Sequence, residues 1–179
     1  MPEPRPKQIW TVGHSNREPE DFLHLLVGAG VEQIADVRRF PGSRRQPHFG
    51  EDALRASLAG RTIAYAHFPA LGGRRGTPAE DSPNTGWRVA SFGAYADYMA
   101  TEAFREGLER LEGFATERRT AMMCSEAVPW RCHRRLVADA LLVRGWEALD
   151  IIAPGRAQPH TLTDFACVHD GALTYPDES

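Results

Sequence analysis

Residues 120–155, "TAMMCSEAVPWRCHRRLVADALLVRGWEALDIIAPG", decide the fold class of this chain. The run "TAMMC" (120–124) is short and apolar, as buried strands are, and "CHRRLVADALLVRG" (132–145) has the apolar spacing of a helix that ends at Gly145. "WEALDIIAPG" (146–155) is again strand-like. A strand, a helix and a strand in this order predict two parallel strands joined by a right-handed crossover.

The same alternation extends back to the start of the chain. Strand-like runs at 8–13, 31–37 and 62–68 are separated by amphipathic stretches at 18–30 and 50–60 that end at glycines. We therefore expect one α/β domain over residues 8–168. It would have a mostly parallel five-stranded sheet with helices on both faces, a Rossmann-like three-layer arrangement. Residues 1–7 and 169–179 are expected to be tails.

Two segments between the third and fourth strands differ in character. Residues 69–86 are dense in glycine, proline, aspartate and asparagine, which predicts a long loop. Its "LGGRRG" (71–76) lacks the Walker spacing of a phosphate loop, but its arginines can reach a ligand as part of a lid. Residues 91–118 are strongly amphipathic and predict one long helix, or two that are separated near Thr101.

Composition favours an ordinary globular protein. The 179 residues are 42% hydrophobic and 25% charged, with a formal net charge of -3, so no global positive field indicates nucleic-acid binding. No apolar run approaches the roughly 18 residues of a membrane span, and the first residues lack the apolar middle of a secretory signal. We expect a cytoplasmic protein with no membrane partner. Three cysteines, an odd number, argue against a disulfide framework.

Polar side chains follow the predicted strands at their carboxyl ends. These are "GHSN" (13–16), "DVRRFPGSRR" (36–45), "HFPALGGRR" (67–75), "CSE" (124–126) and "APGR" (153–156). In open α/β sheets the ligand crevice lies beyond the carboxyl ends of the strands, so these segments are expected to converge. His14 and Ser15 contribute from the first strand, although a capped helix with an exposed histidine explains them equally well.

The arginine-rich segment after the second strand is a candidate anion-binding loop. Asp36 ends a buried strand and is itself a candidate substrate-binding residue, and Arg38 and Arg39 are its nearest partners. Arg38, Arg39 and Ser43 are candidates for holding a phosphate or carboxylate, because guanidinium groups bind such anions through two hydrogen bonds. The alternative is that Asp36 and Arg38 pair and attach the loop to the sheet.

"MCSEAVPWRCHRR" (123–135) holds two of the three cysteines. A thiolate nucleophile at Cys124 is favoured by the helix start and the cations that follow it, since both lower a thiol pKa. Glu126 and His133 are the candidates for proton transfer, whereas Cys132 and Arg134 are candidates for substrate binding. The alternative is that both cysteines are packing residues and that Glu126 neutralises Arg134.

A metal site is a further alternative. Cys124, Cys132 and His133 supply suitable ligand types, and His14 would be added by the fold. The seven residues between the two cysteines do not match the close pairing of ribbon-type zinc sites. We therefore expect neither a metal nor a cofactor.

Six segments resemble the bacterial and archaeal family called domain of unknown function 488. They are "VGHSN", "ADVRRFPGSRR", "YAHFPALGG", "FGAYADYM", "MCSEAVPWRCHRRLVADAL" and "PHTLTDFA". The resemblance extends from Gly13 to about Phe165. It implies a compact α/β domain without an established activity, and it marks Cys124, Glu126, Cys132, His133 and Arg134 as signature positions.

A weaker likeness concerns layout only. "ADVR", "MMC" and "RGWEALDIIAPG" are arranged as in rhodanese domains, where the cysteine at the strand end carries a persulfide. The loop of this chain is longer and contains Pro129, Trp130 and a second cysteine, so the likeness implies little about activity.

Three functions follow from these residues. The first is a thiol-dependent enzyme, a cysteine-dependent transferase or hydrolase, that acts on an anionic small molecule or nucleic acid at the carboxyl ends of the strands. The second is a nucleotide- or nucleic-acid-binding module with structural cysteines. The third is a protein that binds a metal through its cysteine and histidine side chains.

Overall fold

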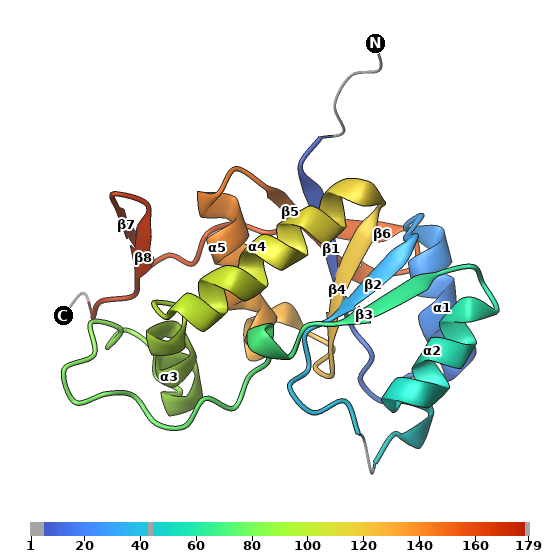
Figure 1. Cartoon of the computed structure of the whole chain (residues 1–179), viewed down its shortest axis with the longest axis horizontal. Coiled ribbons are helices and arrows are strands. Elements are labelled where there is room, and N and C mark those ends of the chain that lie inside the picture. Colours follow the sequence, from blue (N-terminus) through green and yellow to red (C-terminus); the bar gives the residue numbers. More distant parts are fainter. Residues whose placement is uncertain (1–5, 43–44, 178–179) are drawn as a thin grey trace.

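The computed structural model describes residues 6–42 and 45–177 (Figure 1). Within these residues one six-stranded sheet has the order β3-β2-β4-β1-β5-β6. The strands are β1 (Gln8–Gly13), β2 (Gln33–Asp36), β3 (Ala64–His67), β4 (Thr120–Cys124), β5 (Glu147–Ala153) and β6 (Arg156–Pro159). The pairs among β1 to β5 are all parallel, which confirms the α/β fold with a mostly parallel sheet.

The sixth strand corrects the expectation of five. β6 turns back from β5 and pairs with it in antiparallel fashion, and the turn contains Gly155 at a φ of 69°. Glycine adopts positive φ without steric cost, so the chain reverses here and does not enter a crossover. "APGR" (153–156) is therefore a hairpin turn rather than a wall of the crevice.

Helices cover both faces of the sheet, as the sequence predicts. α1 (Pro19–Gly28) and α2 (Glu51–Ala59) lie on one side, and α3 (Ala90–Tyr98), α4 (Glu102–Glu117) and α5 (Arg134–Val143) on the other (Figure 1). Each side has its own apolar cluster. Side chains alternate along a strand, so the side chains of β4 are divided between the two clusters. Ala121 and Met123 pack with α1 and α2, whereas Met122 and Cys124 pack on the side of α5. That alternation directs the Cys124 thiol toward the helix that follows it.

Short 3-10 turns join the larger elements. They are η1 (Pro47–Phe49), η2 (Pro69–Leu71) and η3 (Pro129–Arg131). The amphipathic segment at 91–118 forms two helices, and the second is capped by Thr101, whose hydroxyl accepts a hydrogen bond from the Phe104 amide at 3.3 Å. No helix in the described ranges is long and apolar enough to cross a bilayer.

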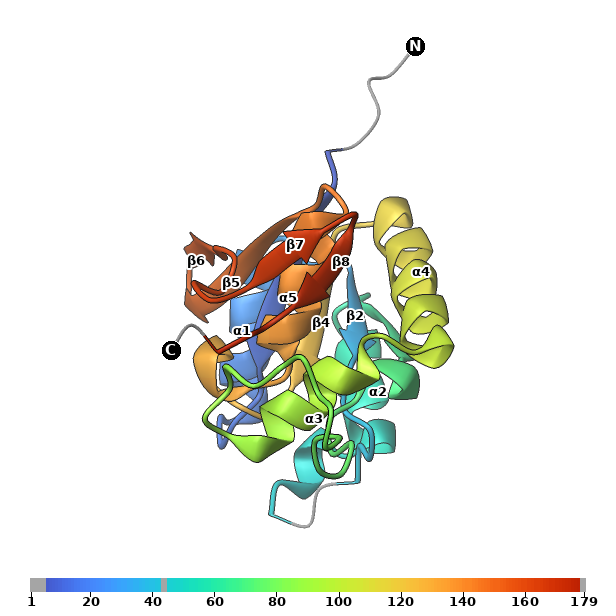
Figure 2. The ribbon, with the colours of Figure 1, turned by 90° about the vertical axis from the view of Figure 1, so that its left-hand side faces the viewer.

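The end of the chain is more ordered than the predicted tail. β7 (Cys167–His169) and β8 (Ala172–Thr174) form a hairpin, which lies in front of α5 in Figure 2. Tyr175 follows it, is fully buried, and donates a hydrogen bond to Asp139 of α5 at 2.8 Å. Residues 169–175 thus belong to the folded domain.

Candidate functional site

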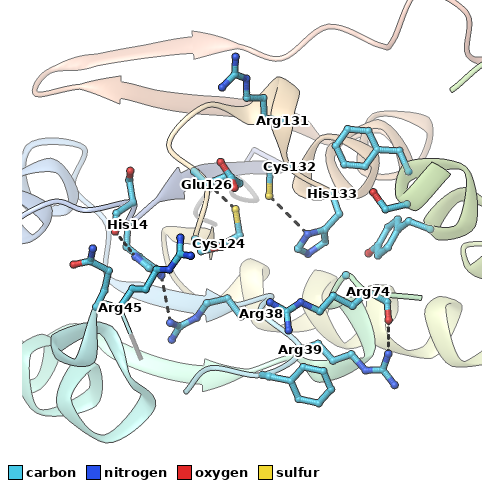
Figure 3. A pocket seen from close by; sticks show the side chains of 18 of the residues that line it. His14, Arg38, Arg39, Arg45, Arg74, Cys124, Glu126, Arg131, Cys132 and His133 are labelled. Atoms are coloured by element: carbon cyan, nitrogen blue, oxygen red, sulfur yellow. Dashed lines mark hydrogen bonds between the residues drawn. The ribbon is translucent and has the colours of Figure 1, made fainter. Parts of the chain in front are cut away.

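A pocket of about 830 Å³ opens at the carboxyl ends of β1, β2 and β4 (Figure 3). Eight of the residues predicted from the sequence line it: His14, Ser15, Arg38, Arg39, Cys124, Glu126, Cys132 and His133. Asp36 and Arg134 do not line it, and Ser43 lies outside the described residues. We call this space the thiol pocket.

Two free cysteines form the floor of the thiol pocket. Cys124 ends β4 and is 1% exposed, and Cys132 follows η3 and is 3% exposed. Helix α5 begins at Arg134, two residues later than the sequence predicts, so Cys132 precedes the helix. Its sulfur accepts the Arg134 amide at 3.4 Å and thereby occupies the electropositive start of α5.

Arg134 holds the loop between the two cysteines in place. Its guanidinium donates to the Cys124 sulfur at 2.8 Å, the Glu126 carbonyl at 2.5 Å, the Ala127 carbonyl at 3.2 Å and the Thr11 hydroxyl at 3.3 Å. The side chain is 1% exposed, which corrects the expectation that it binds substrate. Among the described residues no carboxylate forms an ion pair with Arg134. A buried cation of this kind favours an anion nearby, and the cysteines are the closest groups that can ionise.

The pKa values of the two thiols move in opposite directions. Burial raises the pKa of Cys124 well above its ordinary value, and its hydrogen bond to Cys132 and the charge there add to the effect. Burial also opposes ionisation of Cys132, but the hydrogen bond from Cys124, the charge of Arg134 and the Arg134 amide lower the pKa of Cys132. Within this coupled pair the surroundings favour the charged form at Cys132 and disfavour it at Cys124.

His133 places a base beside Cys132. Its Nε2 lies 3.0 Å from the Val37 carbonyl, which can only accept, so the ring proton is on Nε2. Nδ1 is then free to accept and lies 3.7 Å from the Cys132 sulfur. Burial lowers the pKa of His133, which keeps the ring neutral. Gly73 passes so close that a Cβ there would lie 3.1 Å from Nδ1.

Near β1 and β2 the pocket is lined by Arg38, the cationic half of a buried ion pair, and by a neutral histidine, His14. Arg38 contacts Asp36 through two hydrogen bonds, at 2.9 and 2.8 Å, and Tyr65 donates to the same carboxylate. Arg38 also donates to the Phe49 carbonyl at 2.7 Å and lies 3.4 Å from His14 Nε2. Burial lowers the pKa of His14 to about 4. Most donors of Arg38 thus bind the protein, which supports the structural alternative for Asp36 and Arg38.

The rim of the thiol pocket is cationic. Arg39, Arg45, Arg74 and Arg131 line it together with one carboxylate, that of the exposed Glu126. Arg39 donates to the Arg74 carbonyl at 2.6 Å. Among the described residues no side-chain hydrogen bond or ion pair is formed by Arg45, Arg74 or Arg131. Their donors are available to an anion.

The sequence did not predict four residues that line the thiol pocket. Arg45 and Arg131 carried no signal that separates them from ordinary surface arginines, and Phe92 and Tyr95 look like core residues of α3. The prediction for the 71–76 loop succeeds in part, because Arg74 reaches the pocket whereas Arg75 lies over the Tyr98 ring, 3.9 Å from its centroid. In the part of the chain that the structure describes, no three histidine, cysteine, aspartate or glutamate side chains are grouped so that they could hold a metal ion.

Comparison with known proteins gave one family. The family model described as domain of unknown function DUF488 matches residues 18–141, about two thirds of the chain. No match was found among the curated proteins or among the solved structures. The matched region contains both cysteines of the thiol pocket, Glu126, His133 and Arg134. The chain therefore belongs to the DUF488 family.

Proposed function

We propose that the protein is a thiol-dependent enzyme, a transferase or hydrolase, whose anionic substrate binds in the thiol pocket. The observation that carries the proposal is the environment of Arg134, a buried guanidinium with a thiol at 2.8 Å and no ion-paired carboxylate among the described residues. Ionisation of one cysteine would balance this charge, and a thiolate is the nucleophilic form of cysteine.

The surroundings of the two thiols support Cys132 as the nucleophile. The sequence alone favoured Cys124, but Cys132 has the lowered pKa, the helix start and a neighbouring base. Cys124 then has a supporting part: its sulfur receives a hydrogen bond from Arg134, its own S–H is directed to the Glu126 carbonyl at 3.8 Å, and its interaction with Cys132 helps to lower the pKa of that thiol. The rim arginines would orient the anion above the thiolate.

The reaction proceeds in two steps. His133 Nδ1 takes the Cys132 proton, and the sulfur attacks the electrophilic atom of the substrate, so that a bond to sulfur forms and the bond to the leaving group breaks. The leaving group receives the proton from His133. Water, in a hydrolase, or a second acceptor, in a transferase, then displaces the sulfur and loses its own proton to His133. Glu126, whose carboxylate lines the same pocket, would assist either proton transfer.

Alkylation by iodoacetamide, followed by mass spectrometry from about pH 5 to about pH 9, tests the proposal. We expect Cys132 to react with a midpoint below the ordinary thiol value of about 8.5. The exposed Cys167 serves as the reference thiol within the same molecule. A pH midpoint is informative here because poor access to a buried sulfur slows alkylation at every pH without moving the midpoint.

Two variants show which of the two cysteines is the reactive thiol. Cys132→Ser should abolish the early phase, that is, the alkylation whose midpoint lies below the ordinary thiol value. Cys124→Ala should move the Cys132 midpoint to higher pH because a hydrogen-bond donor is lost. An early phase that persists in Cys132→Ser would assign the nucleophile to Cys124 instead. If neither pocket thiol reacts below the ordinary value, the protein is not a thiol-dependent enzyme of this kind.

A further inference from the structure

A second pocket, of about 460 Å³, lies beside the thiol pocket and differs from it in chemistry. Its apolar wall is formed by Trp87, Val89, Phe92, Trp130 and Phe165. Arg88 and Arg135 flank this wall, and Asp177 is the acidic residue at its edge. We call it the aromatic pocket.

One side of the aromatic pocket is firmly packed and another is open. The Trp87 ring packs against Phe165 and Tyr175, with centroids 4.8 and 5.0 Å apart, and Arg135 lies over it at 5.2 Å. Trp130 is 58% exposed and, among the described residues, stacks on no other ring. An exposed indole offers a flat apolar face to a ligand, and base–aromatic stacking is a common use of such a face.

The two pockets share a wall. Phe92 lines both of them. On η3 the consecutive residues Trp130 and Arg131 belong to the aromatic and the thiol pocket respectively, and Cys132 follows directly. Figure 3 shows Arg131 at the edge of the thiol pocket, next to Cys132 along the chain, with its side chain directed outward. One ligand that contacts both pockets would therefore pass over the thiol pair.

The shape of this double site restricts the ligand. The thiol pocket offers unpaired guanidinium donors, which suit a phosphate, and the aromatic pocket suits a flat ring. Because Phe92 stands between them, the anion and the ring cannot be joined directly and need a spacer. A nucleotide has this construction, since its sugar separates the phosphate from the base.

We infer that the aromatic pocket binds the base of a nucleotide whose phosphate lies among the arginines of the thiol pocket. The inference deepens the proposed function, since it names the substrate class of the same site. The nucleotide is either free or part of a single-stranded nucleic acid, because both present the same phosphate, sugar and base.

Isothermal titration calorimetry of the full chain with five probes tests this. The probes are adenosine 5′-monophosphate, inorganic phosphate, adenosine, phenyl phosphate and a short single-stranded oligoadenylate. The monophosphate is expected to bind about tenfold or more tightly than phosphate or adenosine alone, as stacking of one base predicts. Phenyl phosphate, which lacks the spacer, should bind no better than inorganic phosphate. An oligoadenylate that binds more tightly than the monophosphate, with affinity that falls steeply in salt, assigns the site to nucleic acid, and equal or weaker binding assigns it to free nucleotides.

Paired variants separate the two pockets. Trp130→Leu should weaken the monophosphate about tenfold and leave phosphate unchanged, whereas Trp130→Phe should restore most of the affinity. Arg131→Gln should weaken both ligands by the same factor. The inference is overturned if the monophosphate binds no more tightly than phosphate, if phenyl phosphate equals the monophosphate, or if Trp130→Leu has no effect. Alkylation needs no ligand, so normal thiol reactivity with failed nucleotide binding would reject this inference and leave the proposed function standing.

Discussion

Two buried arginines with different partners define the site at the scale of single residues. Arg38 is 7% exposed and forms a two-bond ion pair with Asp36, so its charge is balanced inside the protein. Arg134 is 1% exposed and directs its donors to carbonyls, a hydroxyl and a thiol. The Asp150 carboxylate reaches it only through Thr11. The difference is what leads us to propose a thiolate in the pair of cysteines beside Arg134.

A prediction about pH belongs to this scale. His14 is 3% exposed and faces Arg38, and burial lowers its pKa to about 4, whereas an unfolded histidine titrates near 6.5. Between these values the unfolded chain binds more protons than the folded one, so the contribution of His14 is fully present above about 6.5 and is lost as the pH falls toward 4.

We expect the free energy of unfolding to fall more steeply on acidification in the native protein than in His14→Gln, by roughly 1–3 kcal/mol. Urea denaturation from about pH 7 to about pH 4.5 measures this difference. His133 titrates in both proteins and cancels in the comparison. Parallel pH profiles for the two proteins would mean that His14 is not held neutral.

At the scale of elements, the site depends on how closely the loop after β4 approaches the end of β1. The His14 amide donates to the Cys124 carbonyl at 3.0 Å and the Ser15 amide to the Ser125 carbonyl at 2.9 Å, which extends the strand pairing into the loops. Gly13 makes the approach feasible, because a Cβ at this position would lie 1.5 Å from the Glu126 carbonyl oxygen.

Gly13→Ala is therefore expected to displace the loop that carries Glu126. Overpacking of this kind costs about 1–3 kcal/mol of unfolding free energy, and the Cys132 midpoint in alkylation should rise as Arg134 loses its contacts. Urea denaturation and the alkylation profile measure the two effects.

Gly113→Ala in α4 is the matched control. A Cβ there meets nothing within 4 Å, so the same change inside a helix should stabilise the protein by about 0.5–1 kcal/mol. Equal effects of the two substitutions would contradict the steric account of Gly13.

At the scale of the whole molecule, the end of the chain supports the helix that carries the site. His160, Thr163 and Tyr175 all hydrogen-bond to Asp139, at 2.7, 2.7 and 2.8 Å. Asp139 is fully buried on α5, the helix whose first residue is Arg134. The C-terminal segment thus holds α5 at its middle, while the thiol site is built at its first residue.

Tyr175→Ala tests whether this segment belongs to the domain. Loss of a fully buried aromatic ring and of its hydrogen bond is expected to lower the unfolding free energy by about 3–5 kcal/mol, measured by urea denaturation. Val168→Ala on the neighbouring β7 removes a side chain that is 46% exposed and should change stability by less than about 0.5 kcal/mol. If residues 169–175 were a tail, Tyr175→Ala would have only the small effect on the unfolding free energy that is expected for Val168→Ala.

The sequence by itself determined the alternation of strands and helices and the gathering of polar residues at the strand ends. β1 and β4 have the predicted bounds because they are apolar runs with clear ends, and the helix break near Thr101 follows from its capping residue. β6 left no such signal, because all four of its residues are exposed and hydrophobic periodicity needs a buried face.

Only the tertiary structure decided which arginine serves which purpose. Arg38, Arg131 and Arg134 look alike in the sequence, yet one is ion-paired, one is on the pocket rim and one is buried against Cys124. The proposed function names Cys132 rather than Cys124 as the nucleophile because of the surroundings that the fold gives it, the start of α5 and the His133 ring. The physical reason is that charge and burial depend on groups far apart in the chain, which only the folded sheet and α5 bring within a few ångströms of one another.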